Sequence, residues 1–203
     1  MRLGTRYDLL NAALFLPAGG SSRLRHRLVR ALDVRPGHRV LELGCGTGQV
    51  TAHLVAAGAQ VTAVDALPEM LDAARRRAPQ ATFVEGDVTT IDLTTIEAGH
   101  DHDRVVLSFV LHNFDAPTRQ AVLRRSAGAL RDGGLVGVLD WAAAGPGLAG
   151  ALRRRLVTAI EPSPTAAELL DGALAADVER AGLHVQHRRR VANGRAEILV
   201  LRP

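Results

Sequence analysis

Short apolar runs alternate with amphipathic segments from about residue 20 to residue 140. Apolar runs of this length are typical of strands buried on both faces of a sheet, and in the segments between them apolar residues recur at helical spacing. Strands that alternate with helices form repeated βαβ units, whose sheets are mostly parallel. The pattern therefore predicts an α/β fold with a mostly parallel open sheet.

Glycine, proline and serine mark where the predicted elements begin and end. Ser21 or Ser22 can cap the first helix, Gly58 stops the second and Pro68 suits the first turn of the third, which ends before Pro79. Gly133 and Gly134 close a fourth helix. The predicted strands cover residues 39–43, 60–65, 81–85, 104–110 and 135–140, and the helices residues 21–32, 49–57, 68–78 and 117–130.

The last third of the chain departs from this alternation. Residues 142–165 are rich in Ala, Gly and Pro and contain an Arg-rich piece, residues 152–160, which predicts a short helix in an insertion. A helix over residues 166–181 follows. Residues 183–191 and 195–201 then flank Asn193-Gly194, which is typical of a β-hairpin. We expect seven strands, with an antiparallel hairpin at the end, in a single domain spanning residues 1–203.

Composition excludes several classes of protein. Of the 203 residues, 47% are hydrophobic and 23% charged, the balance of a globular domain with its own core. Cys45 is the single cysteine, so a disulfide framework or a cysteine zinc site is not expected, and a reducing, cytoplasmic setting fits best. No apolar run approaches the roughly 20 residues of a transmembrane helix.

The basic charge does not by itself indicate a nucleic-acid partner. The sequence pI is about 10.7, but the net charge is only +4, and all 25 basic residues are arginines. Arg23, Arg27 and Arg30 recur at helical spacing opposite a stripe of leucines, as on a solvated helix face. We expect no nucleic-acid partner, and the oligomeric state cannot be inferred from the sequence.

A strand that runs into a glycine-rich turn carries the clearest chemical signal. Residues 40–43 are apolar apart from Glu42, and Gly44, Gly46 and Gly48 follow at alternate positions before a helix. Glycines let the backbone turn sharply and approach a ligand closely, because no Cβ stands in the way. Dinucleotide-binding folds use a related loop, so the loop alone does not identify the ligand.

Carboxylates at three successive strand ends narrow the choice of ligand. Glu42 precedes the glycines, where a negative charge suits an amino group of a ligand and not a pyrophosphate. Asp65 ends the second strand, from which an acidic side chain can bind a ribose diol. Asp87 follows the third strand and can accept a hydrogen bond from an adenine amino group. Together these residues predict a pocket for a nucleoside without phosphates.

At this point the sequence resembles the class I S-adenosyl-L-methionine (SAM)-dependent methyltransferases. The residues that match are 42–48 for the glycine loop, 61–65 for the ribose strand and 85–87 for the adenine loop, and residues 103–108 and 130–135 look like the fourth strand and a later glycine turn. The resemblance extends over residues 36–141. It implies a Rossmann-like fold, SAM as the cofactor, S-adenosyl-L-homocysteine as the product and methyl transfer to an acceptor.

Tyr7-Asp8 followed by Asn11 resembles the N-terminal segment of the branch that methylates quinone precursors, small metabolites and phospholipid head groups. By position, Gly44 and Gly46 would line the methionine part of SAM, and Asp65 would hold the ribose hydroxyls. The cofactor-binding residues implied by the resemblance are Tyr7, Glu42, Gly44, Cys45, Gly46, Asp65, Ala66, Met70, Asp87, Val88 and Ser108.

Methyl transfer from a sulfonium requires alignment and, for some acceptors, removal of a proton. His112 emerges at the end of the fourth strand and is the candidate catalytic base, although a structural histidine is the simpler interpretation. Asn113 and Trp141 are candidate contacts of a small-molecule acceptor. The cluster from His100 to Asp103 resembles a metal site only in composition, and we expect no metal.

Residues 1–20 and 142–165 are candidate lid segments over the cofactor and the acceptor. Leu3, Tyr7, Leu10 and Leu14 lie at helical spacing and form an apolar stripe that must cover something. The alternative is that this stripe packs into the core as an ordinary N-terminal helix.

Other functions on the same scaffold stay open. An RNA or DNA methyltransferase is a competitor because of the arginine content, but the Asn/Asp-Pro-Pro-aromatic signature of amino-directed enzymes is missing after Ser108. A SAM-binding cyclase, an aminocarboxypropyl transferase or a SAM-binding partner protein without turnover could keep the same loop and acids. An NAD-dependent dehydrogenase is disfavoured by the close spacing of the glycines.

Overall fold

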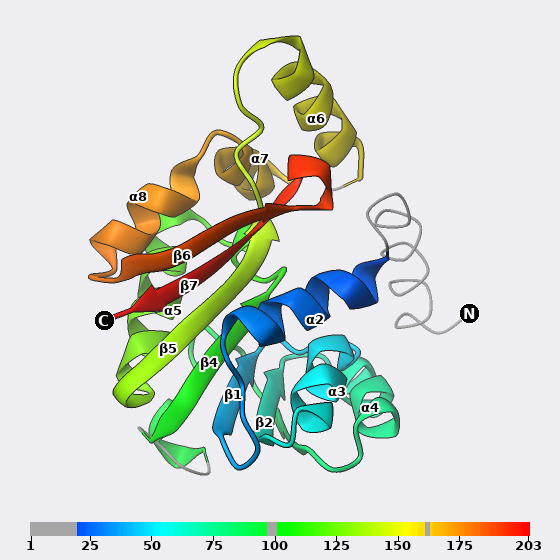
Figure 1. Ribbon diagram of the computed structural model, residues 1–203, viewed down its shortest axis with the longest axis vertical. Coiled ribbons are helices and arrows are strands. Elements are labelled where there is room, and N and C mark those ends of the chain that lie inside the picture. Colours follow the sequence, from blue (N-terminus) through cyan, green and yellow to red (C-terminus); the bar gives the residue numbers. More distant parts are fainter. Residues whose placement is uncertain (1–19, 97–100, 161–162) are drawn as a thin grey trace.

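The computed structural model describes residues 20–203, apart from residues 97–100 and 161–162. Seven strands form one sheet in the order β3-β2-β1-β4-β5-β7-β6 (Figure 1). Five are parallel neighbours, and β7 runs antiparallel to both β5 and β6. The prediction of a mostly parallel, Rossmann-like sheet with an antiparallel C-terminal pair is confirmed. The strands are β1 (Arg39–Leu43), β2 (Gln60–Asp65), β3 (Thr82–Glu85), β4 (His102–Ser108), β5 (Leu130–Trp141), β6 (His184–Val191) and β7 (Ala196–Arg202).

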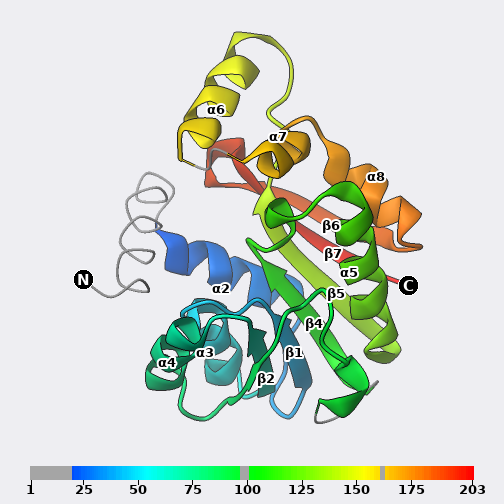
Figure 2. The same ribbon diagram turned by 180° about the vertical axis from the view of Figure 1, so that it is seen from behind.

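Helices cover both faces of the sheet. On the face seen in Figure 1, α2 packs beside α3, and α3 beside α4. On the other face, seen in Figure 2, α5 packs against α8, which follows α7. The helices are α2 (Ser21–Ala31), α3 (Gln49–Ala56), α4 (Pro68–Arg77), α5 (Ala116–Gly128), α6 (Gly147–Ile160), α7 (Pro164–Leu170) and α8 (Ala173–Arg180).

The apolar stripe of α2 is buried against the sheet. Leu24, Leu28 and Leu32 are fully buried, and Leu32 packs on Gly137 of β5 so closely that a Cβ there would collide with the Leu32 side chain. The helix begins as predicted, but its N-cap residue is Gly20 and no side chain caps it. The expected Ser21 or Ser22 cap is therefore wrong.

Two glycines act differently from the prediction around β5. The helix expected over residues 117–130 ends at Gly128, and the strand expected to start at residue 135 already pairs with β4 at Leu130. The register between these strands shifts before Leu135, and Gly133 has a left-handed backbone (φ 76°). The glycine pair therefore bends a strand instead of closing a helix.

The helix expected over residues 166–181 is divided into α7 and α8. Gly172 between them has φ 94°, a conformation that a continuous right-handed helix cannot include. The Arg-rich piece of the insertion is longer than expected and forms all of α6, which projects from the rest of the molecule (Figure 1). Asn193-Gly194 makes the predicted turn, within the 3-10 helix η4 (Ala192–Gly194).

Residues 1–19 lie outside the described part of the chain, so Tyr7 and nearly all of the first candidate lid are not placed. The lid remains a prediction. Among the helices that the structure describes, none has the length and apolar character needed to cross a membrane.

Candidate functional site

The glycine loop begins where β1 ends, at the carboxyl edge of the parallel strands. The backbone N–H groups of Gly44 and Cys45 both donate to the carbonyl oxygen of Val64 in β2, at 2.8 and 2.9 Å. Gly44, Gly46 and Gly48 all have left-handed backbones, with φ between 53° and 75°. The sharp turn that the sequence predicted therefore requires glycine at all three positions.

The three glycines face different surroundings. A Cβ at Gly44 would lie 2.5 Å from the side chain of Val110, and one at Gly48 would lie 2.9 Å from Ala74 in α4. A Cβ at Gly46 would meet nothing within 4 Å, because this residue faces the open cavity. Two glycines thus permit close packing of the loop, and the third leaves room for a ligand.

Glu42 is a buried carboxyl group at the wall of this cavity. Its side chain accepts a hydrogen bond of 2.7 Å from the Thr51 hydroxyl of α3. Burial raises the pKa of Glu42 to about 8, against the opposing effects of the Thr51 hydrogen bond and the positive charge of Arg25. Near neutral pH the group therefore lies close to its titration point, and a cationic ligand would favour the ionised form.

Asp65 and Asp87 hold the loops that surround them. One Asp65 oxygen accepts from the Gly46 N–H at 2.7 Å and the other from the Leu67 N–H at 3.0 Å. In Asp87 a single oxygen accepts both the N–H and the hydroxyl of Thr89, at 2.8 and 2.7 Å, and these bonds hold the Asp87 pKa below its usual range. Carboxylate oxygens have further lone pairs, so both side chains can accept additional bonds from a ligand.

One cavity of about 340 Å³ unites these groups, a volume typical of small-molecule sites. Ten of the eleven predicted cofactor-binding residues line it, and Tyr7 is the one outside the described residues. The predicted acceptor residue Asn113 also lines it. The full lining comprises Arg25, Glu42, Gly44, Cys45, Gly46, Thr47, Gln49, Val50, Asp65, Ala66, Leu67, Met70, Asp87, Val88, Ser108, Phe109, Val110, Asn113 and Phe114.

Phe109 forms a strained part of the cavity wall. It directly follows β4 and has φ 56°, a conformation that bulky side chains rarely adopt. This turn ends the strand at Ser108, two residues before the predicted end at residue 110. Strained backbone of this kind is often found at functional sites.

His112 and Trp141 are not among the described residues that line the cavity. They lie behind Phe109, whose ring centroid is 5.2 Å from that of Trp141 and 6.3 Å from that of His112. His112 Nδ1 lies 2.9 Å from a carboxylate oxygen of the fully buried Asp140, and the His112 side chain is 7% exposed. This arrangement matches the structural interpretation of His112, and its catalytic role stays a prediction.

Cys45 lines the cavity as a buried thiol. Burial first, and then the negative charges of Glu42 and Asp65, raise its pKa far above the usual range. A protonated thiol is a poor nucleophile, so we assign Cys45 no nucleophilic chemistry.

Arg25 is the main site residue that the sequence analysis missed. Its side chain is buried, with 4% of the residue exposed, and its guanidinium carbon lies 5.9 Å from the ring centroid of Phe109. The available signal was its position: Arg25 precedes Leu28, Val29 and Leu32 at the spacing of the buried stripe of α2. Phe109, Val110 and Phe114 were also missed, although they flank residues that were chosen.

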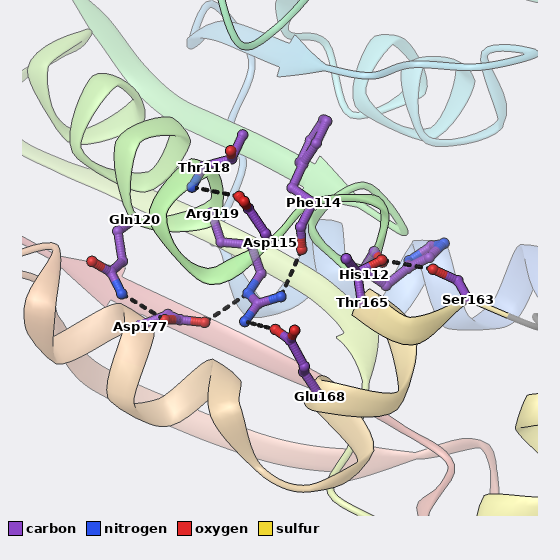
Figure 3. A network of polar contacts seen from close by, with 10 residues as sticks. All are labelled: His112, Phe114, Asp115, Thr118, Arg119, Gln120, Ser163, Thr165, Glu168 and Asp177. Carbon is purple, nitrogen blue, oxygen red and sulfur yellow. Dashed lines mark hydrogen bonds and ion pairs between the residues drawn. The ribbon is translucent and has the colours of Figure 1, made fainter.

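A buried ionic network fixes the far wall of the cavity from behind (Figure 3). Arg119 of α5 is fully buried and donates to the carbonyl oxygen of Phe114 at 2.6 Å. The same guanidinium donates to Asp177 of α8 at 2.6 Å and to Glu168 of α7 at 2.8 Å. The 3-10 helix η3 (Leu111–Asn113) is held as well, since the Thr165 hydroxyl donates to the carbonyl oxygen of His112 at 2.7 Å.

No group of three or more His, Cys, Asp or Glu side chains that could hold a metal ion occurs among the residues that the structure describes. Of the candidate metal cluster from His100 to Asp103, the structure describes the residues from Asp101 onward. His102 is buried and its Nδ1 lies 3.2 Å from the carbonyl oxygen of Ala129.

Comparisons with known proteins agree with this geometry. Residues 40–134 match the family model described as a methyltransferase domain. The chain is 34% identical over 134 residues to an uncharacterized methyltransferase of Synechocystis, covering 66% of this chain and 61% of the relative. It is 40% identical over 109 residues to the demethylmenaquinone methyltransferase of Beutenbergia cavernae, covering 53% and 42% respectively. The chain thus spans roughly half the length of these relatives.

Solved structures share the fold. A TehB-like SAM-dependent methyltransferase of Corynebacterium glutamicum superposes with a TM-score of 0.65 at 20% identity, covering 88% of this chain and 86% of that one. Magnesium protoporphyrin IX methyltransferase of Synechocystis, solved with bound S-adenosyl-L-homocysteine, gives 0.66 at 20% identity, with 88% and 80% covered. The sheet order, the glycine loop and these relatives confirm the resemblance of the chain to the class I SAM-dependent methyltransferases.

Proposed function

We propose that this chain is an enzyme that transfers a methyl group from SAM to a small-molecule acceptor. The observation that carries the proposal is the convergence of Glu42, Asp65 and Asp87 on one cavity beside the open backbone at Gly46. Three carboxylates suit an amino group, a ribose diol and an adenine, and disfavour a ligand with phosphates.

Each part of the cavity has a proposed task. Asp65 accepts hydrogen bonds from the ribose hydroxyls, and Asp87 accepts one from the adenine amino group. Val88 and Met70 supply apolar surface for the adenine ring. The residues proposed for the methionine part are Glu42 and Gly46 from the loop, together with Arg25, whose positive charge suits a carboxylate.

The chain itself needs to supply little chemistry beyond alignment. SAM supplies an activated methyl group when bound. The wall formed by Phe109 and Asn113 orients the acceptor, and the surrounding apolar surface excludes water. His112 is retained as a base only as a prediction, because it is not among the described residues that line the cavity.

The acceptor-side wall fits a flat apolar ring. Phe109, Val110 and Phe114 offer aromatic and aliphatic surface, and Asn113 can place a hydrogen bond on a ring substituent. Several relatives are named demethylmenaquinone methyltransferase. We therefore propose a quinone-like small molecule, with demethylmenaquinone as the first compound to test.

Calorimetric titration with SAM and S-adenosyl-L-homocysteine tests cofactor binding. The Asp65→Ala variant should bind about 10 to 100 times more weakly, since hydrogen bonds to a carboxylate contribute roughly 1.5–3 kcal/mol. Asp72→Ala on the exposed side of α4 is the matched control and should bind normally. Asp65 also anchors the glycine loop. The Asp65→Asn variant keeps an acceptor oxygen, so its affinity should lie between those of Asp65→Ala and Asp72→Ala. Equal affinity in all four proteins would refute the proposed site.

Product analysis tests the reaction. With demethylmenaquinone or a metabolite extract as acceptor, we expect the acceptor to gain one methyl group and S-adenosyl-L-homocysteine to be released. Release of 5'-methylthioadenosine would instead identify transfer of the aminocarboxypropyl arm. Tight SAM binding without any product in such extracts would favour a binding protein over an enzyme.

A further inference from the structure

A second cavity of about 660 Å³ lies between α2 and the edge strand β6, on the sheet face seen in Figure 1. We refer to it as the basic groove. One wall is the exposed face of α2 and the other comes from β6, so residues more than 150 positions apart meet there. The described residues that line it are Arg23, His26, Arg27, Arg30, Ala31, His187 and Arg189.

The periodicities of the two elements explain why basic side chains face one another. Arg23, His26, Arg27 and Arg30 occupy one stripe of α2, and all four are exposed while the leucines between them are buried. His187 and Arg189 are two residues apart in a strand and therefore point to the same side of the sheet. Residues 184–190 of this strand are exposed throughout.

Positive charge is concentrated in these two elements. α2 and β6 together contain seven arginines and no acidic residue. Because the whole chain carries +4, everything outside these two elements carries a net charge of −3. Arg188, on the opposite side of β6, pairs with Glu197. Within the described residues, no ion pair neutralises the four groove arginines.

The lining also limits what the partner can be. Among the described residues that line the groove, Ala31 has the single apolar side chain and none is Phe, Tyr or Trp. It therefore lacks the stacking platforms that hold single-stranded nucleic acid and the apolar surface that holds an acyl chain. The arginines of the groove present planar guanidinium groups, each of which can donate two parallel hydrogen bonds to phosphate oxygens.

We propose that the basic groove binds a compact anion that carries two or more phosphate groups, with Arg27 and Arg189 as facing contacts from the two walls. The site is distinct from the proposed methyl-transfer cavity, since the described residues that line the two cavities have none in common. The proposal therefore does not depend on the proposed function.

Titration with inorganic tripolyphosphate and pyrophosphate, at constant ionic strength, tests this site. We expect saturable binding to the wild-type protein and at least a tenfold loss of affinity in Arg27→Gln/Arg189→Gln. The control is Arg76→Gln/Arg155→Gln, which removes the same charge from exposed positions on α4 and α6 and should bind like the wild type. Thermal unfolding verifies that both double variants are folded.

Three results would overturn the proposal. One is the absence of tripolyphosphate binding to the wild-type protein. Another is an equal loss of affinity in the control, which would mean that binding follows net charge and not the groove. The third is tighter groove-dependent binding of single-stranded RNA, or of vesicles containing anionic phospholipid, than of tripolyphosphate. S-adenosyl-L-homocysteine affinity, measured in the same samples, reports separately on the proposed methyltransferase site.

Discussion

The ionisation of Glu42 should make ligand binding in the cavity depend on pH. With a pKa of about 8, it is mostly protonated at pH 6 and increasingly ionised as the pH rises. The ammonium group of S-adenosyl-L-homocysteine should bind better beside the ionised form. We expect affinity to rise between pH 6 and 7.5, by at most about tenfold per pH unit, with proton release detected calorimetrically in buffers of different ionisation enthalpy.

Glu42→Gln is the control for this pH dependence, because it retains the shape of the side chain and cannot ionise. Its affinity should be lower and nearly flat over the same range. The raised pKa of Glu42 also affects the stability of the fold. Because the pKa in the folded protein lies above the ordinary value of 4.5, the free wild-type protein should lose stability as the pH rises from 4.5 towards 8. An unchanged pH slope in Glu42→Gln would contradict both expectations.

Arg25 should distinguish ligands by their carboxylate. Its buried guanidinium lines the cavity, so Arg25→Met should weaken binding of S-adenosyl-L-homocysteine by roughly tenfold or more. Binding of 5'-methylthioadenosine, which has no carboxylate, should change little. Parallel titrations of both ligands check this, and equal losses for the two would assign Arg25 a purely structural role.

Residues with a local signature could be predicted from the sequence, whereas residues placed by tertiary packing could not. Gly46, Asp65 and Asp87 each stand at a fixed distance from a strand end, so their convergence follows from the parallel sheet. Phe109 lines the cavity because its backbone turns left-handed after β4, which no neighbouring residue signals. Arg25 was missed because arginines on an amphipathic helix are usually solvated. Its spacing from the leucine stripe nevertheless places it on the buried face of α2.

Among the elements, the Arg119 network should dominate the docking of α7 and α8. Arg119 and Asp177 are both almost fully buried. Removing one partner leaves an uncompensated buried charge, so Arg119→Met should reduce the free energy of unfolding by about 3–5 kcal/mol. Urea denaturation measures this loss.

The double variant Arg119→Met/Asp177→Leu separates the pair from its surroundings. It removes both charges and should recover a large part of the stability lost by Arg119→Met. Glu168 is the matched comparison, because its side chain is 46% exposed and Glu168→Gln should cost about 1 kcal/mol or less. A double variant less stable than either single variant would contradict this account.

The predicted bounds of helices and strands were wrong where a glycine had two possible roles. Gly172 and Gly133 both have positive φ, yet one divides a helix and the other bends a strand. The periodicity on either side of each was compatible with a longer or shorter element, and tertiary pairing with β4 decided the second case. Elements bounded by unambiguous signals, such as β2 and α4, were predicted closely.

At the scale of the whole molecule, ligand binding should stabilise the fold as one cooperative unit. At a concentration about 100 times its Kd, S-adenosyl-L-homocysteine should add roughly 2.7 kcal/mol. For a protein of this size that corresponds to a rise of about 5–10 °C in the thermal midpoint. Differential scanning calorimetry measures the shift, and NAD at the same concentration should produce none.

The wall beside the proposed acceptor site is joined to α5 and α7 through the carbonyl oxygens of Phe114 and His112. Every amino acid carries such an oxygen, so the anchorage does not depend on which side chains stand at these two positions. Evolution can therefore exchange the groups that meet an incoming molecule while the scaffold stays in place. A single architecture of this kind can serve chemically different substrates without a new set of supports.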